Sequence, residues 1–422
     1  MRSGPSYVAS CGDVIIKNML TSVRNFLVLL ALLVPGSVAA QALITQDLEV
    51  RLLPDAHRLE GEAVLRVGSP SDWPESFALA GAACIDEVLV AGEPRPYHFE
   101  QGRLKADLAD TTRLTIRYTV EFNDPVPQQM VGIEDPSYGI SATIQPEGTY
   151  LSAASGWHPR PLGRLSLFRV TVVAPVGTTG VTAGRLMDHA TTANQTRTVW
   201  QTQLPQDGLA LAAGHYQMQR QDLGDLKVMV FFRAANSALV PGYLAACRDY
   251  LQLYQDLFGP YPYAKFAVVE NFYPTGYGLP GWTLLGSRII RLPFIRTTSL
   301  PHEIAHAWWG NAVEVDYGSG NWAEGLATYV ADYFLQERQS PQAAREYRRK
   351  ISRDYAALVD QDRPLSAFRG RMSKSDQALG YGKAAMVFHL LRQVIGDDAF
   401  WRGLQQAAQE GLGRRYAWSD LQ

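Results

Sequence analysis

The sequence predicts an α+β protein with several domains, in which an antiparallel β-sandwich or saddle precedes a mainly helical domain. A length of 422 residues fits two or three domains. From about Leu43 to Gln221, apolar and polar residues alternate with the period of a half-buried strand. After residue 237 the apolar spacing is mostly helical. We therefore divide the chain into an N-terminal extension with a signal segment (1–40), a β domain (43–222) and a C-terminal domain (223–422).

The composition is that of a globular protein, and it limits the partners. The chain is 46% hydrophobic and 19% charged, which allows a sizeable core. Its formal net charge is −2, so we expect no nucleic-acid partner and no attraction to an anionic membrane surface.

The N-terminal region has the pattern of a secretory signal peptide. Arg24 precedes an apolar run from Phe26 to Val34, and a Pro-Gly break and small residues follow as far as Ala40. The run is too short to span a bilayer. We expect cleavage after Ala40, with Ala42 as a second possibility, followed by export to the periplasm or the extracellular space and no stable membrane span. The start of the chain stays open between Met1 and Met19, and Met19 would place the signal near its own N-terminus.

Cysteine is scarce in the expected mature chain, which retains Cys84 and Cys247. Cys247 lies on a helical apolar stripe, which favours a buried thiol, while a disulfide between the two cysteines stays open.

Strands and helices follow from the apolar spacing. In the β domain, alternation is clearest from Leu114 to Phe122. In the C-terminal domain we expect strands at 226–232 and 265–270, and helices over 237–258, 299–309, 321–337, 341–361 and 381–395. Ser419 is a candidate cap of a further helix, which leaves the last helical unit unfinished.

The stretch "HEIAHAWWGN", residues 302–311, carries the strongest chemical signal. Residues four apart share one face of a helix, so His302 and His306 can direct two imidazoles at one point. Two histidines at this spacing, with a glutamate after the first, are typical of a catalytic zinc site. The alternative is a core helix with two hydrogen-bonded histidines.

A catalytic zinc ion takes a third protein ligand and leaves a fourth position for water. The candidate is Glu324 in "GNWAEGLATYV", at the start of the next expected helix. A capping box with Asn321 as N-cap is the alternative. Gly325 favours the ligand, since a glycine inside a helix costs about 1 kcal/mol unless the metal-bearing helix must come close. We expect one zinc ion per chain on His302, His306 and Glu324.

Glu303 is the expected general base. Zinc lowers the pKa of a bound water towards about 7, and Glu303 beside it can accept the proton as the water attacks a carbonyl. Thr328, one turn after Glu324, is either a hydrogen-bond partner behind the ligands or a plain helix residue.

The segments "HEIAHAWWGNAV" and "NWAEGLATYVADY" together resemble the zinc aminopeptidase family that includes alanyl aminopeptidase, in the gluzincin clan. The resemblance covers nearly the whole mature chain, although one residue fewer than usual separates His306 from Glu324. It implies a thermolysin-like catalytic domain behind a β-saddle, and a tyrosine from a later helix that stabilises the oxyanion. Here "GYGKAA" offers Tyr381 for that role; the alternative is that Tyr381 heads a buried helical stripe.

One motif departs from the family pattern. The family's GxMEN segment uses its glutamate to bind the free amine of the substrate, and the matching "GYGLPGW" has Leu279 at that position. Gly276, Tyr277 and Gly278 are still expected to line the substrate as a strand. Glu270, slightly upstream, is a candidate substitute for the amine anchor.

We interpret the chain as an exported zinc metallopeptidase of the aminopeptidase type, acting on peptides. The alternatives are a hydrolase of the same fold with relaxed or endo specificity or a non-peptide substrate, and a binding module without catalysis. The last is disfavoured because binding alone needs neither Glu303 nor Tyr381.

Overall fold

The computed structural model describes residues 43–126 and 139–421, and the predicted signal segment lies outside them. One compact unit comprises Ala42–Gln422. Among the described residues, no helix combines the length and the apolarity of a bilayer span.

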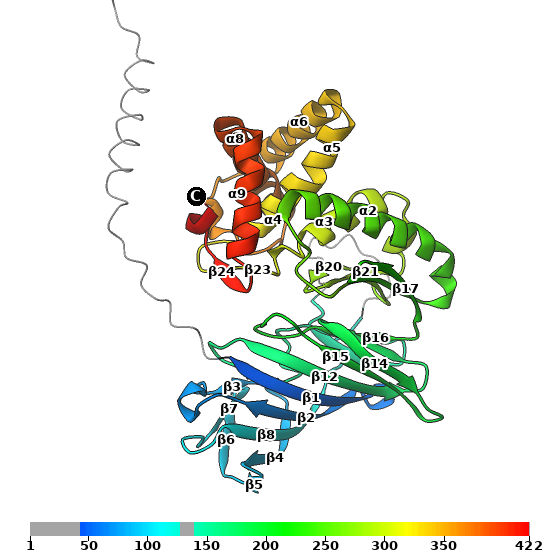
Figure 1. Cartoon of the computed structure of the whole chain (residues 1–422), viewed down its shortest axis with the longest axis vertical. Helices are drawn as coiled ribbons and strands as arrows, with labels where there is room; N and C mark the ends of the chain where they lie inside the picture. Colours follow the sequence, from blue (N-terminus) through cyan, green and yellow to red (C-terminus); the bar gives the residue numbers. More distant parts are fainter. Residues whose placement is uncertain (1–42, 127–138, 422) are drawn as a thin grey trace, which may run out of the picture. The chain divides into compact units, whose positions relative to one another are not determined.

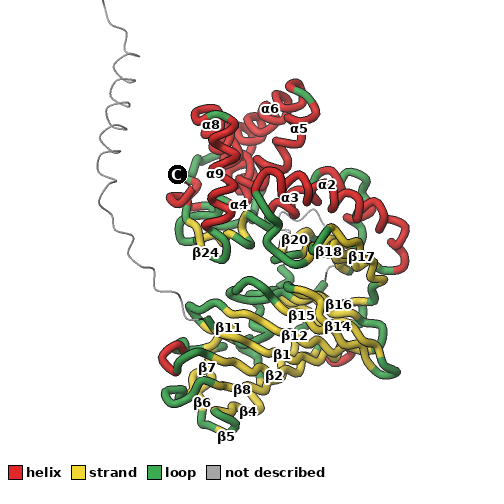
Figure 2. The backbone as a smooth tube through the Cα atoms, viewed as in Figure 1, coloured by secondary structure: helices red, strands yellow, loops and turns green. Residues whose placement is uncertain are grey.

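The N-terminal part of this unit consists of β-sheets (Figures 1 and 2). The largest has the strand order β14 (Arg185–Thr191), β15 (Gln195–Gln201), β12 (Ser166–Pro175), β1 (Ile44–Leu53), β2 (Arg58–Arg66), β8 (Arg113–Glu121), β4 (Cys84–Val90) and β5 (Glu93–Pro94). Adjacent strands of this sheet run antiparallel to each other, except β1 and β12, which run parallel. In β8 the predicted apolar positions are buried, Leu114, Ile116, Tyr118 and Val120.

Two smaller sheets complete the β part. One has the order β13 (Thr179–Thr182), β16 (Leu211–Gly214), β10 (Gly148–Leu151) and β9 (Ala142–Gln145). The other has the order β11 (Arg160–Pro161), β3 (Phe77–Ala78), β7 (Arg103–Ala106) and β6 (Tyr97–Glu100). The predicted succession of a β part and a helical part is confirmed.

A five-stranded sheet opens the second part, in the order β17 (Gln217–Leu223), β18 (Leu226–Phe232), β19 (Lys265–Asn271), β21 (Trp282–Gly286) and β20 (Gly276–Leu279). The boundary that we expected between residues 222 and 223 falls inside the β17–β18 hairpin. Alternation identifies a strand but does not say which sheet it joins, so β17 was assigned to the wrong side. The short strand β20 forms one edge of this sheet.

The helices are α2 (Val240–Phe258), α3 (Ser299–Ala305), α4 (Ala323–Ala327), α5 (Phe334–Gln339), α6 (Pro341–Leu358), α7 (Lys374–Gln377), α8 (Ala384–Ile395) and α9 (Asp397–Glu410). A π-helical turn, Thr328–Tyr333, joins α4 to α5, and a second one, Ala378–Lys383, joins α7 to α8. A small parallel sheet contains β22 (Trp309–Gly310), β23 (Val313–Val315) and β24 (Arg414–Tyr416).

Two helix limits and one whole helix differ from the predictions. The helix expected over 299–309 ends at Ala305, because the next amides bond three residues back and the chain then joins β22. The helix expected from 381 starts at Lys374, where the Ser373 hydroxyl accepts a hydrogen bond from the Asp376 amide. Helix α9 was not predicted.

The two cysteines in the described part of the chain do not form a disulfide. Cys84 and Cys247 are both free thiols, Cys84 exposed and Cys247 buried. The prediction of a buried thiol on the stripe of α2 is therefore confirmed, and stability rests on packing.

Candidate metal centre

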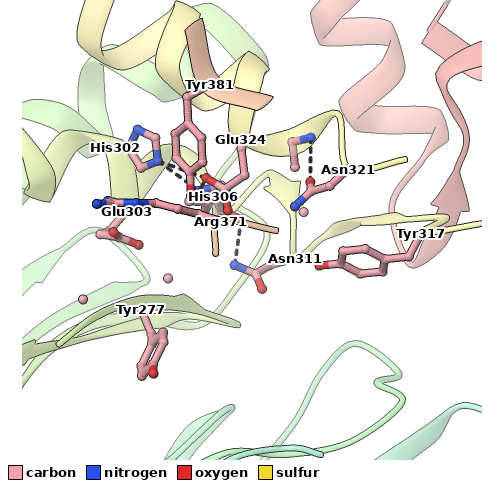
Figure 3. Close-up of a pocket in the computed structure, with 14 residues that line it drawn as sticks. Tyr277, His302, Glu303, His306, Asn311, Tyr317, Asn321, Glu324, Arg371 and Tyr381 are labelled. Atoms are coloured by element: carbon pink, nitrogen blue, oxygen red, sulfur yellow. Dashed lines mark hydrogen bonds and ion pairs between the residues drawn. The ribbon is translucent and has the colours of Figure 1, made fainter. Parts of the chain in front are cut away.

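Helix α3 directs both histidines at one point. Its back is anchored by Leu300 and Ile304, which are fully buried. On its front the Nε2 atoms of His302 and His306 lie 3.2 Å apart. One carboxylate oxygen of Glu324, from α4, lies 3.4 Å from the Nε2 of His302 and 3.3 Å from that of His306. Two helices thus bring the three predicted ligands together (Figure 3).

The three atoms fit a zinc ion. A tetrahedral zinc with bonds of about 2.0–2.1 Å holds its ligand atoms about 3.3 Å apart, which is the spacing that these atoms have. Among the described residues this is the group of histidines and carboxylates able to hold a metal ion. Two imidazole nitrogens and one carboxylate oxygen are also the ligand types that catalytic zinc uses.

Each histidine is oriented by a hydrogen bond at its other ring nitrogen. The Nδ1 of His302 lies 3.2 Å from a carboxylate oxygen of Asp332, and the Nδ1 of His306 lies 2.9 Å from the carbonyl oxygen of Trp309. Such bonds fix the tautomer that leaves Nε2 free for a metal. Burial lowers the pKa of His302, but the charge and hydrogen bond of Asp332, together with Glu324 and Glu303, raise this pKa well above its usual value.

Asp332 takes the supporting role for which Thr328 was the candidate, and Thr328 follows its alternative, a plain helix residue. The hydroxyl of Thr328 is buried without a hydrogen-bond partner among the described residues. In a regular helix Asp332, eight residues after Glu324, would lie about 80° around the axis from it. The wider π turn between them reduces the rotation per residue and returns Asp332 to the ligand face. The sequence alone gave no sign of that turn.

The capping-box alternative for Glu324 does not hold. The side chain of Asn321 accepts a hydrogen bond from the Ala323 amide, 3.1 Å, but the Glu324 carboxylate faces the imidazoles and does not return to a cap. Our reason for Gly325 was only partly right. A Cβ there would lie 2.3 Å from the Cβ of Ala384, so the close neighbour is α8 rather than the histidine helix.

Glu303 lies beside the ligands and lines the same pocket. Burial raises the pKa of its carboxyl group, and the two histidines oppose this shift. A Cβ on Gly278 would lie 2.7 Å from a carboxylate oxygen of Glu303 and 3.0 Å from the Cβ of His306, so a larger residue in β20 would displace the Glu303 carboxylate. Gly276 and Tyr277 of the same strand also line the pocket.

Tyr381 comes from the second π turn. Its ring stacks beside that of His302, with the centroids 6.1 Å apart and an angle of 12° between the planes. Burial, helped by the charge of Glu324, raises the pKa of its hydroxyl well above the usual value, so the group remains a donor. The alternative of a buried stripe fails, because Leu391 and Ile395 further along it are exposed.

These side chains surround a pocket of about 360 Å³ (Figure 3). Its wall also contains Asn311, Asn321 and Arg371. Glu270 is not part of this wall. It is 1% exposed and accepts hydrogen bonds from the Arg233 amide, the Asn236 amide group and the Ser287 hydroxyl.

A β-sheet part followed by a helical part, with two histidines and a glutamate on consecutive helices, is the arrangement of the gluzincin class of zinc peptidases. Residues 296–415 match the family model "Peptidase family M1 domain". The resemblance to zinc aminopeptidases that the motifs indicated is therefore confirmed, and its residues His302, His306, Glu324 and Tyr381 all lie inside the matched segment.

Similar proteins and similar solved structures support the same resemblance. The yeast (Saccharomyces cerevisiae) protein "Aminopeptidase 2, mitochondrial" is 25% identical over 175 residues, which cover 37% of this chain and 18% of that protein. Human "Aminopeptidase RNPEPL1" is 32% identical over 91 residues, covering 20% of this chain and 12% of the other. The chain thus spans less than a fifth of the length of these relatives.

The crystal structure of an M1 zinc metallopeptidase from Deinococcus radiodurans superposes with a TM-score of 0.70 at 21% identity, covering 90% of this chain and 88% of that one. Native yeast LTA4 hydrolase gives a TM-score of 0.69 at 15% identity, covering 90% and 64%. At these identities the likeness establishes the fold, which is the predicted one.

Proposed function

We propose that this chain is an exported zinc metallopeptidase that hydrolyses peptide bonds, with Glu303 as general base and Tyr381 as oxyanion donor. The observation that carries the proposal is the convergence of His302, His306 and Glu324 at zinc-ligand spacing, with a carboxylate and a phenol hydroxyl beside them. A binding module without catalysis would need His302, His306 and Glu324 to hold the metal, but it would need neither Glu303 nor Tyr381.

Each side chain has one task in the reaction. Zinc, when bound, acts as a Lewis acid and lowers the pKa of water. Glu303 takes up the proton of the attacking water and transfers it to the leaving amine. Tyr381 stays protonated and donates a hydrogen bond to the negative charge that develops on the carbonyl oxygen. The edge strand β20 offers its backbone to a substrate in extended conformation.

We further propose that a free N-terminus matters less here than in a strict aminopeptidase. Leu279 replaces the amine-binding glutamate, and the hydrogen bonds of Glu270 hold it inside the protein. A second pocket, which shares Gly310, Asn311 and Tyr317 with the first, does contain acids. These acids have partners of their own.

Two of them are paired with arginines. Asp207 lies 3.0 Å from Arg160 and 3.6 Å from Arg415, and Glu314 lies 3.1 Å from Arg415. Asp316 accepts a hydrogen bond from the Gly318 amide at 2.9 Å. An ammonium group would have to compete with these contacts.

Export is proposed from the sequence pattern of residues 19–40 alone. N-terminal sequencing of the protein recovered outside the cytoplasm tests it. A mature chain that begins after Ala40 supports export, and a retained chain with an intact N-terminus contradicts it.

The proposed activity is tested with Glu303→Gln in the zinc-loaded protein. We expect zinc content to stay at one equivalent while peptide hydrolysis falls about 10²- to 10⁴-fold, because the amide does not accept the proton. Turnover is measured on a mixture of free and N-acetylated peptides. Equal turnover by the variant would remove Glu303 as base, and no cleavage of any peptide by the zinc-loaded wild type would refute the peptidase assignment.

A further inference from the structure

Arg371 is a charged group of the pocket that the proposed reaction does not use. It lines the pocket together with Glu303, Glu324 and the two histidines (Figure 3). Its positive charge acts on the hydroxyl of Tyr381, where it opposes the rise in pKa. Sequence reasoning missed it, because it lies in a loop far from either metal motif along the chain.

Among the residues that the structure describes, the guanidinium of Arg371 has no hydrogen-bond or ion-pair partner. Its Nε is buried without a hydrogen-bond partner, and it forms no ion pair with any carboxylate in the part of the chain that the structure describes. Nearby cations behave differently: Arg363 pairs with Asp376 and Lys383 pairs with Asp362. An arginine that faces a pocket without a counter-charge is suited to bind an anion.

The backbone on both sides of Arg371 is held in place. On one side, the amide of Asn321 donates to the carbonyl of Phe368 at 2.8 Å, next to the helix that carries Glu324. On the other side, the amide of Met372 donates to Asp376 at 3.1 Å, at the start of the helix that carries Tyr381. The loop is therefore fixed to the two helices that build the site, and Arg371 is presented between them.

The charges of the pocket also favour the binding of an anion. A divalent ion would balance the carboxylates of Glu303 and Glu324, which leaves the charge of Arg371 uncompensated. The position that would carry an amine-binding glutamate holds Leu279 instead. The strand beside the pocket thus lacks the acid that would attract an ammonium group, and the pocket itself contains a cation that attracts a carboxylate.

We propose that Arg371 binds a carboxylate group of the substrate and makes this enzyme selective for peptides that carry one near the bond to be cleaved. This inference rests on the proposed peptidase function and names its substrate class. The carboxylate is either an acidic side chain or the C-terminal end of a short peptide, and both present the planar pair of oxygens that a guanidinium binds with two hydrogen bonds.

Three peptides separate the two sources: Ala-Ala-Ala amide, which has no carboxylate, Ala-Glu-Ala amide, which has one on a side chain, and Ala-Ala-Ala acid, which has one at its end. For the wild type we expect kcat/KM to be about 10- to 100-fold higher for at least one carboxylate-bearing peptide than for the neutral amide. The preferred peptide identifies the source. Arg371→Gln should lose this ratio, and Arg371→Lys should keep part of it.

Arg402→Gln is the matched control, because it removes one exposed positive charge of the same part of the chain outside the pocket. It should keep both the rate and the ratio of the wild type. Equal kcat/KM values for the three peptides in the wild type, or an unchanged ratio in Arg371→Gln, would overturn the proposal.

Binding measurements separate this proposal from the peptidase assignment. Calorimetry of the zinc-loaded Glu303→Gln protein with the same peptides reports affinity without turnover, and the Glu303→Gln/Arg371→Gln variant shows the contribution of the guanidinium. Preferential binding of a carboxylate peptide that vanishes in the double variant supports the role of Arg371 even if no peptide is cleaved. Equal binding of all three peptides contradicts it.

Discussion

Replacing Gly325 with alanine tests how closely the two helices of the site must pack. An added Cβ would lie 2.3 Å from the Cβ of Ala384 and 3.1 Å from its carbonyl carbon, whereas ordinary contacts begin at 3.4 Å. Both neighbours are rigid parts of α8, so the helices must separate by about 1 Å. Such overpacking costs typically 1–3 kcal/mol, and alanine recovers about 1 kcal/mol of helix propensity. Because three atoms clash, we expect a net loss of about 1–2 kcal/mol.

The assay is urea unfolding of the zinc-loaded protein, read as a lower midpoint with an unchanged slope. A second readout is turnover, because Glu324 is next to Gly325 and Tyr381 precedes Ala384 by one helical turn. Separating the helices moves the phenol away from the ligand, so kcat should fall as well.

A double-mutant cycle makes this reasoning refutable. Ala384→Gly removes the methyl group that an alanine at Gly325 would strike, and alone it should cost about 1 kcal/mol of helix propensity. If the clash is the cause, the double variant loses less stability than the two single variants added together. Strict additivity, or a Gly325→Ala protein as stable as the wild type, would show that the two helices do not limit each other there.

Two further predictions concern the metal and the β part. Asp332→Ala should weaken zinc binding about 10- to 100-fold in competition with a chelator, since His302 loses its orienting carboxylate, and an unchanged affinity would exclude that role. Burial lowers the pKa of His158 from 6.5 to about 4, so the unfolded chain binds a proton first and stability should fall as pH decreases from about 6.5 to 4. The contribution of neutral His158 to stability is fully present above pH 6.5, and His158→Gln should reduce the loss of stability below this pH by up to about 3 kcal/mol. Identical pH profiles of wild type and variant would contradict this role of His158.

The sequence was sufficient where local geometry determines the result. The i, i+4 spacing of His302 and His306 places both on one face of any helix, and Glu324 follows at the start of the next one. The alternation of β8 likewise identifies its buried apolar side chains, although the polar Thr115 between them is buried as well. These features depend on a few neighbouring residues and on no distant contact.

The remaining features depend on contacts between distant segments or on irregular turns. Asp332 reaches His302 only because a π turn changes the phase of the helix, and Arg371 enters the pocket through a loop held by Asn321 and Asp376. The β17–β18 hairpin could not be predicted for a similar reason, because the alternation within one strand does not identify the strand with which it pairs. Gly325 was recognised as a close approach, but the neighbour could be identified only in three dimensions.

The two π turns have a consequence for changes in chain length. Deleting one residue between Thr328 and Ala331 would tighten the wide turn into an α-helical one and place Asp332 seven residues after Glu324, about 20° around the axis. The helix would persist with a full set of backbone hydrogen bonds, and Glu324 and Asp332 would still share a face. A deletion in a regular turn of the same helix would instead rotate the residues after it by about 100°. The π turns, Thr328–Tyr333 and Ala378–Lys383, are therefore the places where these helices can lose a residue without a change of angle at the metal.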